Sequence, residues 1–368
     1  MALFPIFGKK SPTFAAGTPD FLIVGQGLAG TLLAFALEAR GMKICVIDDG
    51  WRSAASRIAA GVLNPVTGMR IVKTLGVDDL LPAAKRVYAA LGERFGETFF
   101  REIPFYRFYT SEHERTVKAR RVAEPEYEGW LSEDVPAGTL CGGALADRLG
   151  GFFVNRAGRL DLPKLLDCAR ADFRSRGVLI EENFDGADVE IARVGALWRG
   201  NAFRRGIIFC EGFRVRENPW FGHLKWQPAK GEFVELECAG TERFQAQILK
   251  NTTVAVPLGG ARWLVGTNYD RENLNCEPTP GREAIFSRAF TALFSKNAEN
   301  FSAGTPRILA HRAGVRPSVQ GALPKVGAHE QFPQLFLFNG FGSKGVTWIP
   351  LYAERFAEKL AAAGTGKR

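Results

Sequence analysis

Hydrophobic and polar positions alternate in a readable order over the segment 21–48. Four apolar residues over 21–24 predict a short buried strand, and apolar residues at helical spacing over 32–37 predict a helix that ends at Arg40 and Gly41. A second strand is predicted over 43–47. This order of strand, helix and strand is typical of a parallel β-α-β unit.

The turn between the first strand and the helix has the motif GxGxxG, formed by Gly25, Gln26, Gly27, Leu28, Ala29 and Gly30. Gly25 permits a tight turn, Gly27 lets a pyrophosphate approach the backbone, and Gly30 lets the helix pack closely on the strand. The helix N-terminus offers free N–H groups to the phosphates. Asp48 ends the second strand at about the spacing, roughly 20 residues, at which an acidic side chain binds ribose hydroxyls. We therefore predict a dinucleotide-binding unit; the alternative for the motif alone is a plain tight turn.

Similar patterns predict further elements along the chain. Helices are expected over about 77–100, 163–176, 280–295 and 349–363, with Asp161 capping the second. Strands are expected over the apolar or alternating runs 105–110, 152–154, 178–180, 187–194, 196–198, 207–210, 231–237, 247–249, 253–257, 262–267 and 335–338. The glycines in 258–261 predict a hairpin turn, whereas 111–146 shows no readable pattern.

Charge and cysteine usage narrow the function classes. The net charge of +9 would suit nucleic acid or anionic substrates, but the basic residues are spread out, and a solvated basic surface is the simpler interpretation. The six cysteines form no CxxC motif and the four histidines have no ligand spacing, which predicts a reducing cytoplasm, no disulfide framework and no metal site.

Hydropathy and the order of residues at the N-terminus predict neither a membrane-spanning helix nor a secretory signal. No run of about 18 apolar residues exists, so the sequence predicts no membrane-spanning helix. Residues 1–17 place apolar positions before the lysines, which is the reverse of a secretory signal, and we expect a flexible leader there.

Two further segments are built for close approach by a ligand. Small residues dominate 53–61, directly after Asp48, where a backbone with small side chains can lie against a flat ring. Near the end of the chain, the strand over 335–338 enters a glycine-rich segment, 339–347, and then a helix. This is the second strand–glycine turn–helix arrangement in the chain, and it again presents free N–H groups at a helix N-terminus.

These segments together resemble the D-amino-acid oxidase/glycine oxidase family of FAD enzymes. The matching motifs are GxGxxG with Asp48, the run SRIAAGVLNP over 56–65, the run GVRP over 314–317, the run LPKVG over 323–327, and the run NGFGSKG over 339–345. The resemblance implies an α/β fold, α+β overall, with a Rossmann-like FAD-binding domain of the glutathione-reductase type and a second, antiparallel-sheet substrate domain. It assigns 18–76, 147–214 and 305–368 to the FAD-binding domain, and 77–146 and 215–304 to the substrate domain.

The resemblance also implies which residues hold the cofactor. Ser56, Arg57, Ala59, Ala60 and Gly61 would lie along the isoalloxazine ring. The complete predicted cofactor set is Gly25, Gly27, Leu28, Ala29, Gly30, Asp48, Asp49, Ser56, Arg57, Ala59, Ala60, Gly61, Gly212, Gly342, Ser343, Lys344, Gly345, Val346 and Thr347. Some family members attach FAD through a cysteine near the last of these segments, and because this chain has none there, noncovalent FAD is expected.

Two cations are the candidate catalytic residues. Hydride transfer to flavin N5 leaves negative charge over N1 and the C2 oxygen, and Lys344 with the neighbouring amides would stabilise that charge. Arg316 matches a substrate carboxylate bidentately, and the resemblance gives it that role. The alternatives are a solvated cation for Lys344 and a structural ion pair for Arg316.

The predicted reaction is the FAD-dependent oxidation of the C–N bond of a small amine or amino acid. A first alternative follows from similarity to the oxidase half of the bifunctional enzyme that modifies the tRNA wobble uridine. The GSKG run over 342–345 and the basic charge favour it, and the lack of a methyltransferase half in these 368 residues weighs against it. A second alternative is a non-catalytic flavoprotein. The substrate, the electron acceptor and the oligomeric state stay open.

Overall fold

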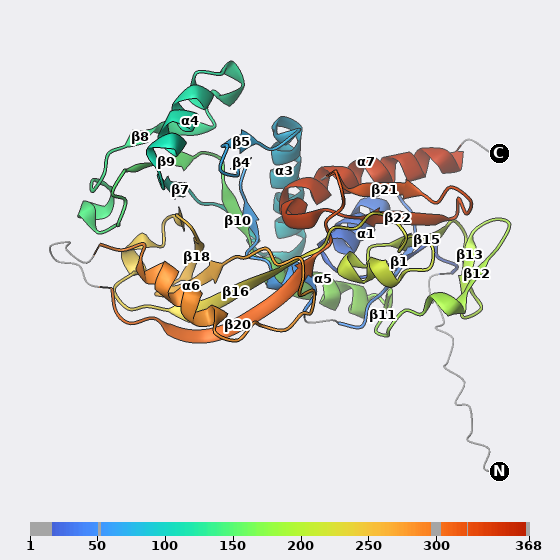
Figure 1. The fold of residues 1–368 in the computed structure, drawn as a ribbon. Coiled ribbons are helices and arrows are strands. Elements are labelled where there is room, and N and C mark those ends of the chain that lie inside the picture. The colour runs from blue at the N-terminus through green and yellow to red at the C-terminus, as the bar shows by residue number, and fades with distance from the viewer. Residues whose placement is uncertain (1–16, 51–52, 296–302, 322, 366–368) are drawn as a thin grey trace, which may run out of the picture.

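Two large sheets occupy the two ends of the molecule, and helix α3 (Val77–Phe95) stands between them (Figure 1). This computed structural model describes residues 17–50, 53–295, 303–321 and 323–365. The leader expected over 1–17 therefore lies outside the described residues except for Gly17. Across the described residues, no helix is both long enough and apolar enough to cross a lipid bilayer.

The first sheet has six strands and contains the predicted β-α-β unit. Its order is β11 (Leu179–Ile180), β2 (Ile44–Ile47), β1 (Phe21–Val24), β15 (Gly206–Phe209), β22 (Leu335–Asn339) and β21 (Lys325–Ala328). The first five strands are parallel and β21 is antiparallel to β22. Strands β1, β2 and β15 are buried at every position, which explains why they read as uninterrupted apolar runs.

Helices cover one face of this sheet and a small sheet covers the other. The covering helices are α1 (Leu28–Glu38), α5 (Leu162–Ser175) and α7 (Gly345–Thr365). On the opposite face, Trp198 and Phe203 of a three-stranded sheet pack on Leu22 and Ile47. That small sheet consists of β12 (Val189–Ile191), β13 (Ala196–Trp198) and β14 (Asn201–Phe203).

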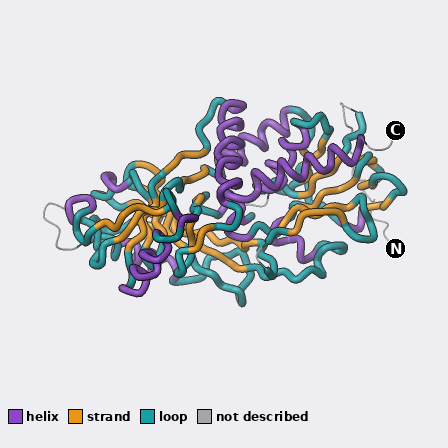
Figure 2. The backbone as a smooth tube through the Cα atoms, turned by 90° about the horizontal axis from the view of Figure 1, so that it is seen from above, coloured by secondary structure: helices purple, strands orange, loops and turns teal. Residues whose placement is uncertain are grey.

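The second sheet has eight strands and is antiparallel apart from one pair. Its order is β20 (Arg307–Arg316), β16 (Ala229–Glu237), β19 (Arg262–Gly266), β18 (Val254–Gly259), β17 (Ile248–Lys250), β7 (Phe105–Phe108), β9 (Gly151–Val154) and β8 (Leu131–Val135). Only β17 and β7 run parallel among these neighbours. Helix α6 (Arg282–Thr291) packs on it, with Phe290 against Trp263 in a separate core. Figure 2 shows this half as mostly strands and loops, while the long helices gather over the other half.

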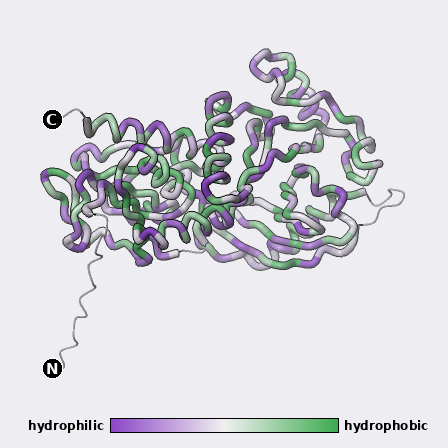
Figure 3. The backbone as a smooth tube through the Cα atoms, turned by 180° about the vertical axis from the view of Figure 1, so that it is seen from behind, coloured by the Kyte–Doolittle hydropathy of each residue, from purple (hydrophilic) through white to green (hydrophobic). Residues whose placement is uncertain are grey.

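Short elements connect the two halves. They are the sheet of β3 (Val62–Leu63), β10 (Gly158–Leu160) and β6 (Phe100–Glu102), the hairpin of β4 (Val66–Thr67) and β5 (Val72–Lys73), and the helices α2 (Ala55–Ile58) and α4 (Glu112–Val122). Helices α3 and α7 alternate between hydrophobic and hydrophilic positions along their length (Figure 3), and their buried faces meet in the largest core.

The mixed fold class predicted from the sequence is confirmed, and most elements lie where the pattern placed them. Asp161 caps α5 by accepting from the Lys164 N–H, as expected. Helix α7 begins at Gly345 rather than near 349, and α4 lies in the stretch that gave no pattern. Strands β9 and β20 belong to the eight-stranded sheet, although the expected boundaries group their residues with the FAD-binding segments. The domain boundaries stay a prediction.

Candidate functional site

A cavity of about 1100 Å³ lies between the two sheets. Its walls combine the carboxyl ends of β1, β2 and β15 with residues of the eight-stranded sheet, such as Phe233 and Val254. Ligands of open parallel sheets bind outside the carboxyl ends of the strands, where this cavity lies. Its volume slightly exceeds the range of roughly 300–1,000 Å³ that holds a drug-sized molecule, as expected for a dinucleotide together with a substrate.

The N-terminal glycine turn is held by close backbone packing. Gly25 has a φ of +99°, and a Cβ added there would lie 2.7 Å from the Cys210 carbonyl oxygen. A Cβ added at Gly30 would lie 1.9 Å from the Gly25 carbonyl oxygen, so α1 can approach the turn only with glycine there. Leu28 N–H, in the first turn of α1, donates to Ser56 Oγ at 3.1 Å. The Ser56 hydroxyl therefore lies beside the first turn of α1 and links the small-residue segment to the glycine turn.

Asp48 is fixed by three donors at the end of β2. Its carboxylate accepts from Gln26 N–H at 2.8 Å, from Gly50 N–H at 2.7 Å and from Arg170 Nη1 of α5 at 2.7 Å. Arg170 Nη1 also donates to the Gln26 side-chain oxygen at 3.0 Å. The carboxylate thus ties the glycine turn to α5 while lining the cavity, and its role toward a ribose stays a prediction.

The small-residue segment after Asp48 approaches the cavity closely, with one exception. A Cβ at Gly61, where φ is +72°, would lie 1.9 Å from the Leu160 carbonyl oxygen of β10. Ala59, Ala60 and Gly61 line the cavity. Arg57, expected along the ring, does not line it; its guanidinium pairs with Asp167 of α5 at 2.7 Å. The physical reason is that α2 contacts α5 and directs this long side chain to the outer surface.

The C-terminal glycine segment enters the same cavity. Residues 342–347, which form a short 3₁₀ turn and the first residues of α7, all line it. Gly342 has a φ of +54°, which favours glycine, and α7 presents its first amide groups at the wall. Two segments from opposite ends of the chain therefore meet at one ligand space.

Lys344 is half-buried at this wall. Its Nζ donates to Thr74 Oγ1 at 3.1 Å, and no carboxylate of the described residues lies within 4.0 Å of it. Burial lowers the pKa of the Lys344 ammonium below its ordinary value. A fully solvated cation, the alternative for this residue, does not match this environment.

Arg316 lies at the end of β20 with neutral partners only. Its guanidinium donates to Thr267 Oγ1 at 2.7 Å and to the carbonyl oxygen of Asn268 at 3.2 Å, and it lies 4.2 Å from the ring centre of Tyr269. Among the described residues, no carboxylate lies within 4.0 Å of it, so the ion-pair alternative finds no partner there. Burial lowers its pKa. The cavity thus contains a guanidinium whose charge the described chain leaves uncompensated.

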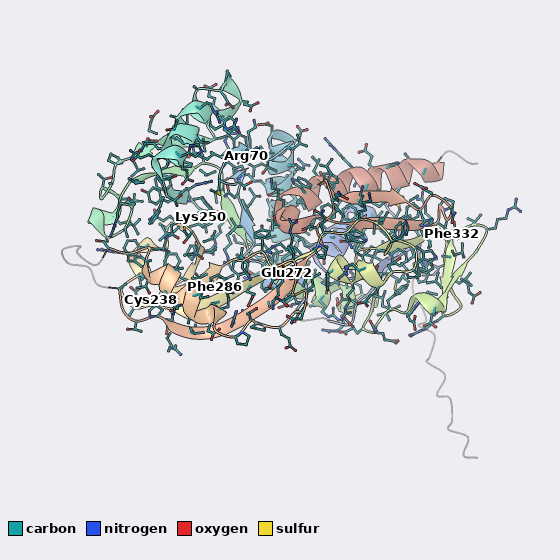
Figure 4. The ribbon with its side chains drawn as sticks, in the orientation of Figure 1. Arg70, Cys238, Lys250, Glu272, Phe286 and Phe332 are labelled. Carbon is teal, nitrogen blue, oxygen red and sulfur yellow. The ribbon has the colours of Figure 1, made fainter. Side chains whose placement is uncertain are left out.

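Several wall residues carry no sequence signal. Glu211 lines the cavity beside Gly212, and burial raises the pKa of its carboxyl to about 7. Lys250 lines it from β17, in the half of the molecule built on the eight-stranded sheet (Figure 4). Glu211 adjoins the predicted Gly212 but the sequence assigns it no role, and Lys250 lies in no motif, because its placement depends on the pairing of strands distant in sequence.

Most of the predicted residues are brought together. Those that line the cavity are Gly25, Gly27, Leu28, Ala29, Asp48, Asp49, Ser56, Ala59, Ala60, Gly61, Gly212, Arg316, Gly342, Ser343, Lys344, Gly345, Val346 and Thr347. Gly30 and Arg57 do not line it. The described residues contain no group of three or more His, Cys, Asp or Glu side chains that could hold a metal, and all six cysteines are free.

The wall suits a flavin dinucleotide. A Cβ added at Gly212 would meet no protein atom within 4 Å, and one at Gly27 would meet only Ser56 Oγ at 3.4 Å. Backbone is therefore exposed to the cavity at both positions, as close approach by a phosphate or ribose requires. Helix N-termini of α1 and α7 and the small residues 59–61 complete a surface for phosphates and a flat ring.

Comparison with known proteins points the same way. The family model described as FAD dependent oxidoreductase matches residues 20–359. The tRNA 5-methylaminomethyl-2-thiouridine biosynthesis bifunctional protein MnmC of Aromatoleum aromaticum is 25% identical, with 94% of this chain and 58% of that protein covered. Glycine oxidase of Pseudomonas aeruginosa is 22% identical, with 92% and 94% covered. The chain thus spans little more than half of the first relative and nearly all of the second.

A solved structure has the same fold. The crystal structure of glycine oxidase from Geobacillus kaustophilus superimposes with a TM-score of 0.76 at 21% identity, covering 94% of this chain and 95% of that one. The crystal structure of iminodiacetate oxidase from Chelativorans gives a TM-score of 0.73 at 20% identity. At these identities the structures establish the architecture of the fold.

Proposed function

The chain belongs to the family of FAD-dependent oxidoreductases, and on that basis we propose that it oxidises a C–N bond adjacent to a carboxylate in an amine or amino acid. The observation that carries this proposal is Arg316, a cavity-lining guanidinium without a carboxylate partner among the described residues. An anionic substrate group would supply the missing charge, and guanidinium is the side chain best shaped to bind a carboxylate through two hydrogen bonds.

The residues that would hold FAD form two groups. The glycine turn at 25–30, Asp48 and Ser56 would bind the pyrophosphate and ribose, while 59–61 and 342–347 would border the flavin ring. Bound FAD supplies the acceptor for the hydride that leaves the carbon next to nitrogen. The substrate CH–NH group, losing this hydride and a proton, becomes C=N, and water then hydrolyses it to a carbonyl compound and an amine.

Arg316 would orient the substrate. Its guanidinium is held by the Thr267 hydroxyl and by backbone carbonyl groups, and it stacks on Tyr269. These neutral contacts fix the plane of the guanidinium and leave its charge available. A carboxylate bound there would place the neighbouring C–N bond in one defined position, which is the main requirement for an efficient transfer.

Lys344 would provide positive charge from the C-terminal glycine segment of the cavity wall. It is half-buried and bound only to the Thr74 hydroxyl among the described side chains, so it stabilises negative charge that develops nearby more strongly than a solvated lysine would. Its lowered pKa means that the ammonium is lost at a lower pH than in an exposed lysine. Noncovalent attachment of FAD is part of the proposal.

The test is anaerobic reduction of the bound flavin by a panel of glycine, N-alkylglycines and amines without a carboxylate. We expect bleaching by the carboxylate-bearing amines. Arg316→Met should raise the concentration for half-maximal rate about 10- to 100-fold, the usual cost of a lost charged hydrogen bond. Arg355→Met, an exposed arginine of α7, serves as control. Bleaching of all amines alike, or an unchanged Arg316→Met variant, would contradict the proposal.

A second candidate substrate is supported by the MnmC relative and by the net charge of +9. In this case the oxidised amine would be attached to a tRNA wobble uridine. A tRNA whose wobble uridine carries an N-alkylated aminomethyl group would then bleach the flavin at micromolar concentration, and added salt would weaken the reaction steeply. Bleaching by free N-alkylglycines with equal efficiency would argue against this substrate.

A further inference from the structure

Lys250 is a further cation on the cavity wall, and several strands of the eight-stranded sheet separate it from Arg316. It ends β17, where it pairs in parallel register with Arg107 of β7 and in antiparallel register with Val254 of β18. All three residues line the cavity. Lys250 is half-buried, so its ammonium is partly removed from water.

The charges of these two neighbouring cations are compensated differently. Arg107 Nε donates to Glu114 Oε1 at 2.7 Å and Nη1 donates to the Gly68 carbonyl oxygen at 2.8 Å. Glu114 also accepts from the Thr110 N–H and hydroxyl groups, so its oxygens are committed. Lys250 Nζ donates to the carbonyl oxygen of its neighbour Asn251, and among the described residues no carboxylate lies within 4.0 Å of it.

Burial without a nearby counter-charge destabilises the charged form of Lys250, and the pKa of its ammonium group reflects this. Burial and the nearby Arg107 lower the pKa of Lys250 to about 8, while Glu114 acts weakly in the other direction. A group in this situation gains more from a bound anion than an exposed lysine does. The surrounding fold provides the cation and the space, while Glu114 is bound to Arg107 and the described residues place no carboxylate within 4.0 Å of Lys250.

The strand register gives the separation of Lys250 from Arg316. The Arg316 guanidinium binds the hydroxyl of Thr267, which follows Gly266 at the end of β19. Gly266 pairs with Val254, and on the far side of β18 Lys250 pairs with Val254. Gly266 and Lys250 are therefore two strand spacings apart, roughly 10 Å. Both cations face one continuous cavity.

We propose that Lys250 forms a second anion subsite and that the substrate is a secondary amine with two anionic groups, a carboxylate next to the oxidised C–N bond and a carboxylate or phosphate roughly 10 Å away. This inference rests on the proposed function, because Arg316 binds the first carboxylate there. Lys250 determines specificity: it binds the distal anion and discriminates against amines with a neutral tail. The subsite takes no part in the transfer of hydride.

The first test measures binding without turnover. A thioether carrying a carboxymethyl group and a carboxypentyl group on sulfur cannot be oxidised as an amine, and its neutral counterpart carries a hexyl group instead. Calorimetry on the FAD-loaded protein should show the diacid binding about 10- to 100-fold more tightly than the hexyl compound. Replacing the distal carboxylate by a phosphate ester decides which anion the subsite prefers.

Lys250→Met should abolish the preference for the charged tail and leave the affinity for the hexyl compound unchanged. Lys250→Arg should retain it, and Lys359→Met, at an exposed lysine of α7, should behave as the wild type. The flavin content and melting temperature of each variant establish that it is folded. Equal affinity of the wild-type protein for both thioethers, or a preference that persists in Lys250→Met, would overturn the proposal.

Anaerobic flavin bleaching separates this inference from the proposed function. N-carboxypentylglycine should bleach the flavin more efficiently than N-hexylglycine in the wild type, and equally in Lys250→Met. If no N-substituted glycine bleaches the flavin, the proposed function fails while the thioether measurements still decide the subsite. If both amines bleach it equally in the wild type, the proposed function stands and the Lys250 subsite is wrong.

Discussion

At the scale of single residues, the cavity depends on glycine positions where the lack of a side chain leaves space for a functional side chain. Gly231 of β16 pairs with Gly314 of β20, two residues before Arg316. A Cβ added at Gly231 would lie 2.0 Å from Arg316 Nη2 and 2.4 Å from its Cζ. The glycine thus determines where the guanidinium can lie, although it touches no ligand itself.

Gly231→Ala should therefore act through Arg316. The added methyl group forces the guanidinium off Thr267, and we expect the Michaelis constant for a carboxylate-bearing amine to rise about 10-fold or more with little change in flavin content. The steady-state kinetics of Gly231→Ala, Arg316→Met and the double variant form a double-mutant cycle, which measures the coupling between the two residues. If the two effects add fully in the double variant, Gly231 does not act through Arg316 and this account is wrong.

Glu211 gives a pH-dependent contribution to stability. Burial raises its pKa to about 7, above the ordinary value of 4.5, so between these values the folded protein binds a proton that the unfolded chain has released. Stability from this group therefore falls as pH rises from about 4.5 to 7, by up to roughly 3 kcal/mol. Urea unfolding of the FAD-free protein from pH 5 to 8 should show this decline, and Glu211→Gln should lack it. A parallel decline in Glu211→Gln would assign the slope to other groups.

The residues that sequence predicted and those it missed differ in a physical way. Gly25 and Gly30 were predictable because the tight turn between β1 and α1 requires glycine at both positions. Arg170 and Lys250 were not, because their positions follow from α5 packing against the glycine turn and from the β17–β7 register. Arg57 shows the converse: it lies in the predicted motif, but its side chain does not line the cavity and pairs with Asp167.

At the scale of elements, the largest difference from the sequence interpretation concerns the start of α7. A helix beginning near 349 would put Pro350 in its first turn, where proline is favoured. The helix begins at Gly345 instead and contains Pro350 in its interior. Because proline has no N–H, the carbonyl group of Val346 lacks its helical donor. The Tyr88 hydroxyl of α3 donates to that oxygen at 2.7 Å in a buried position.

This hydrogen bond predicts that a second substitution, Pro350→Ala, restores stability lost when the Tyr88 hydroxyl is removed. Tyr88→Phe should lower the free energy of unfolding by about 1–3 kcal/mol, since the buried Val346 carbonyl group loses the donor that takes the place of the missing N–H of Pro350. Adding Pro350→Ala supplies an N–H group for Val346 and should restore part of the loss. Chemical denaturation of both variants and of Pro350→Ala alone tests it. If the double variant is no more stable than Tyr88→Phe, the Tyr88 hydroxyl does not replace a helical donor.

Helix α4 was missed for a related reason. Its side chains are mostly charged, so no apolar stripe of helical period marks it, and its stability comes from tertiary contacts and from the Ser111 cap, which accepts from the Glu114 N–H. Strands β1, β2 and β15 were predicted easily, because both of their faces are buried and every position is apolar. Local patterns thus identify elements buried on the sheet and fail for those held by polar contacts.

At the scale of the whole molecule, the site depends on segments that are distant in sequence. The turn at 25–30, the segment 54–61 and the segment 339–347 all reach the same cavity, and residues of β17 and β20 close its other side. The sequence predicted the two glycine turns separately. Their meeting was implied by the family resemblance rather than by any pattern, because hydrophobic periodicity contains no information about the order of strands within a sheet.

A single cofactor that bridges these segments should protect them together. On adding FAD to the apoprotein, we expect amide hydrogen exchange to slow at 25–30, 54–61 and 339–347 over the same range of FAD concentration, since one binding event orders all three. The turn at 258–261, which does not line the cavity, serves as the internal control. Protection of 25–30 alone would mean that the C-terminal glycine segment is not part of the cofactor site. Protection of the two ends at different FAD concentrations would likewise contradict a single cofactor held from both ends of the chain.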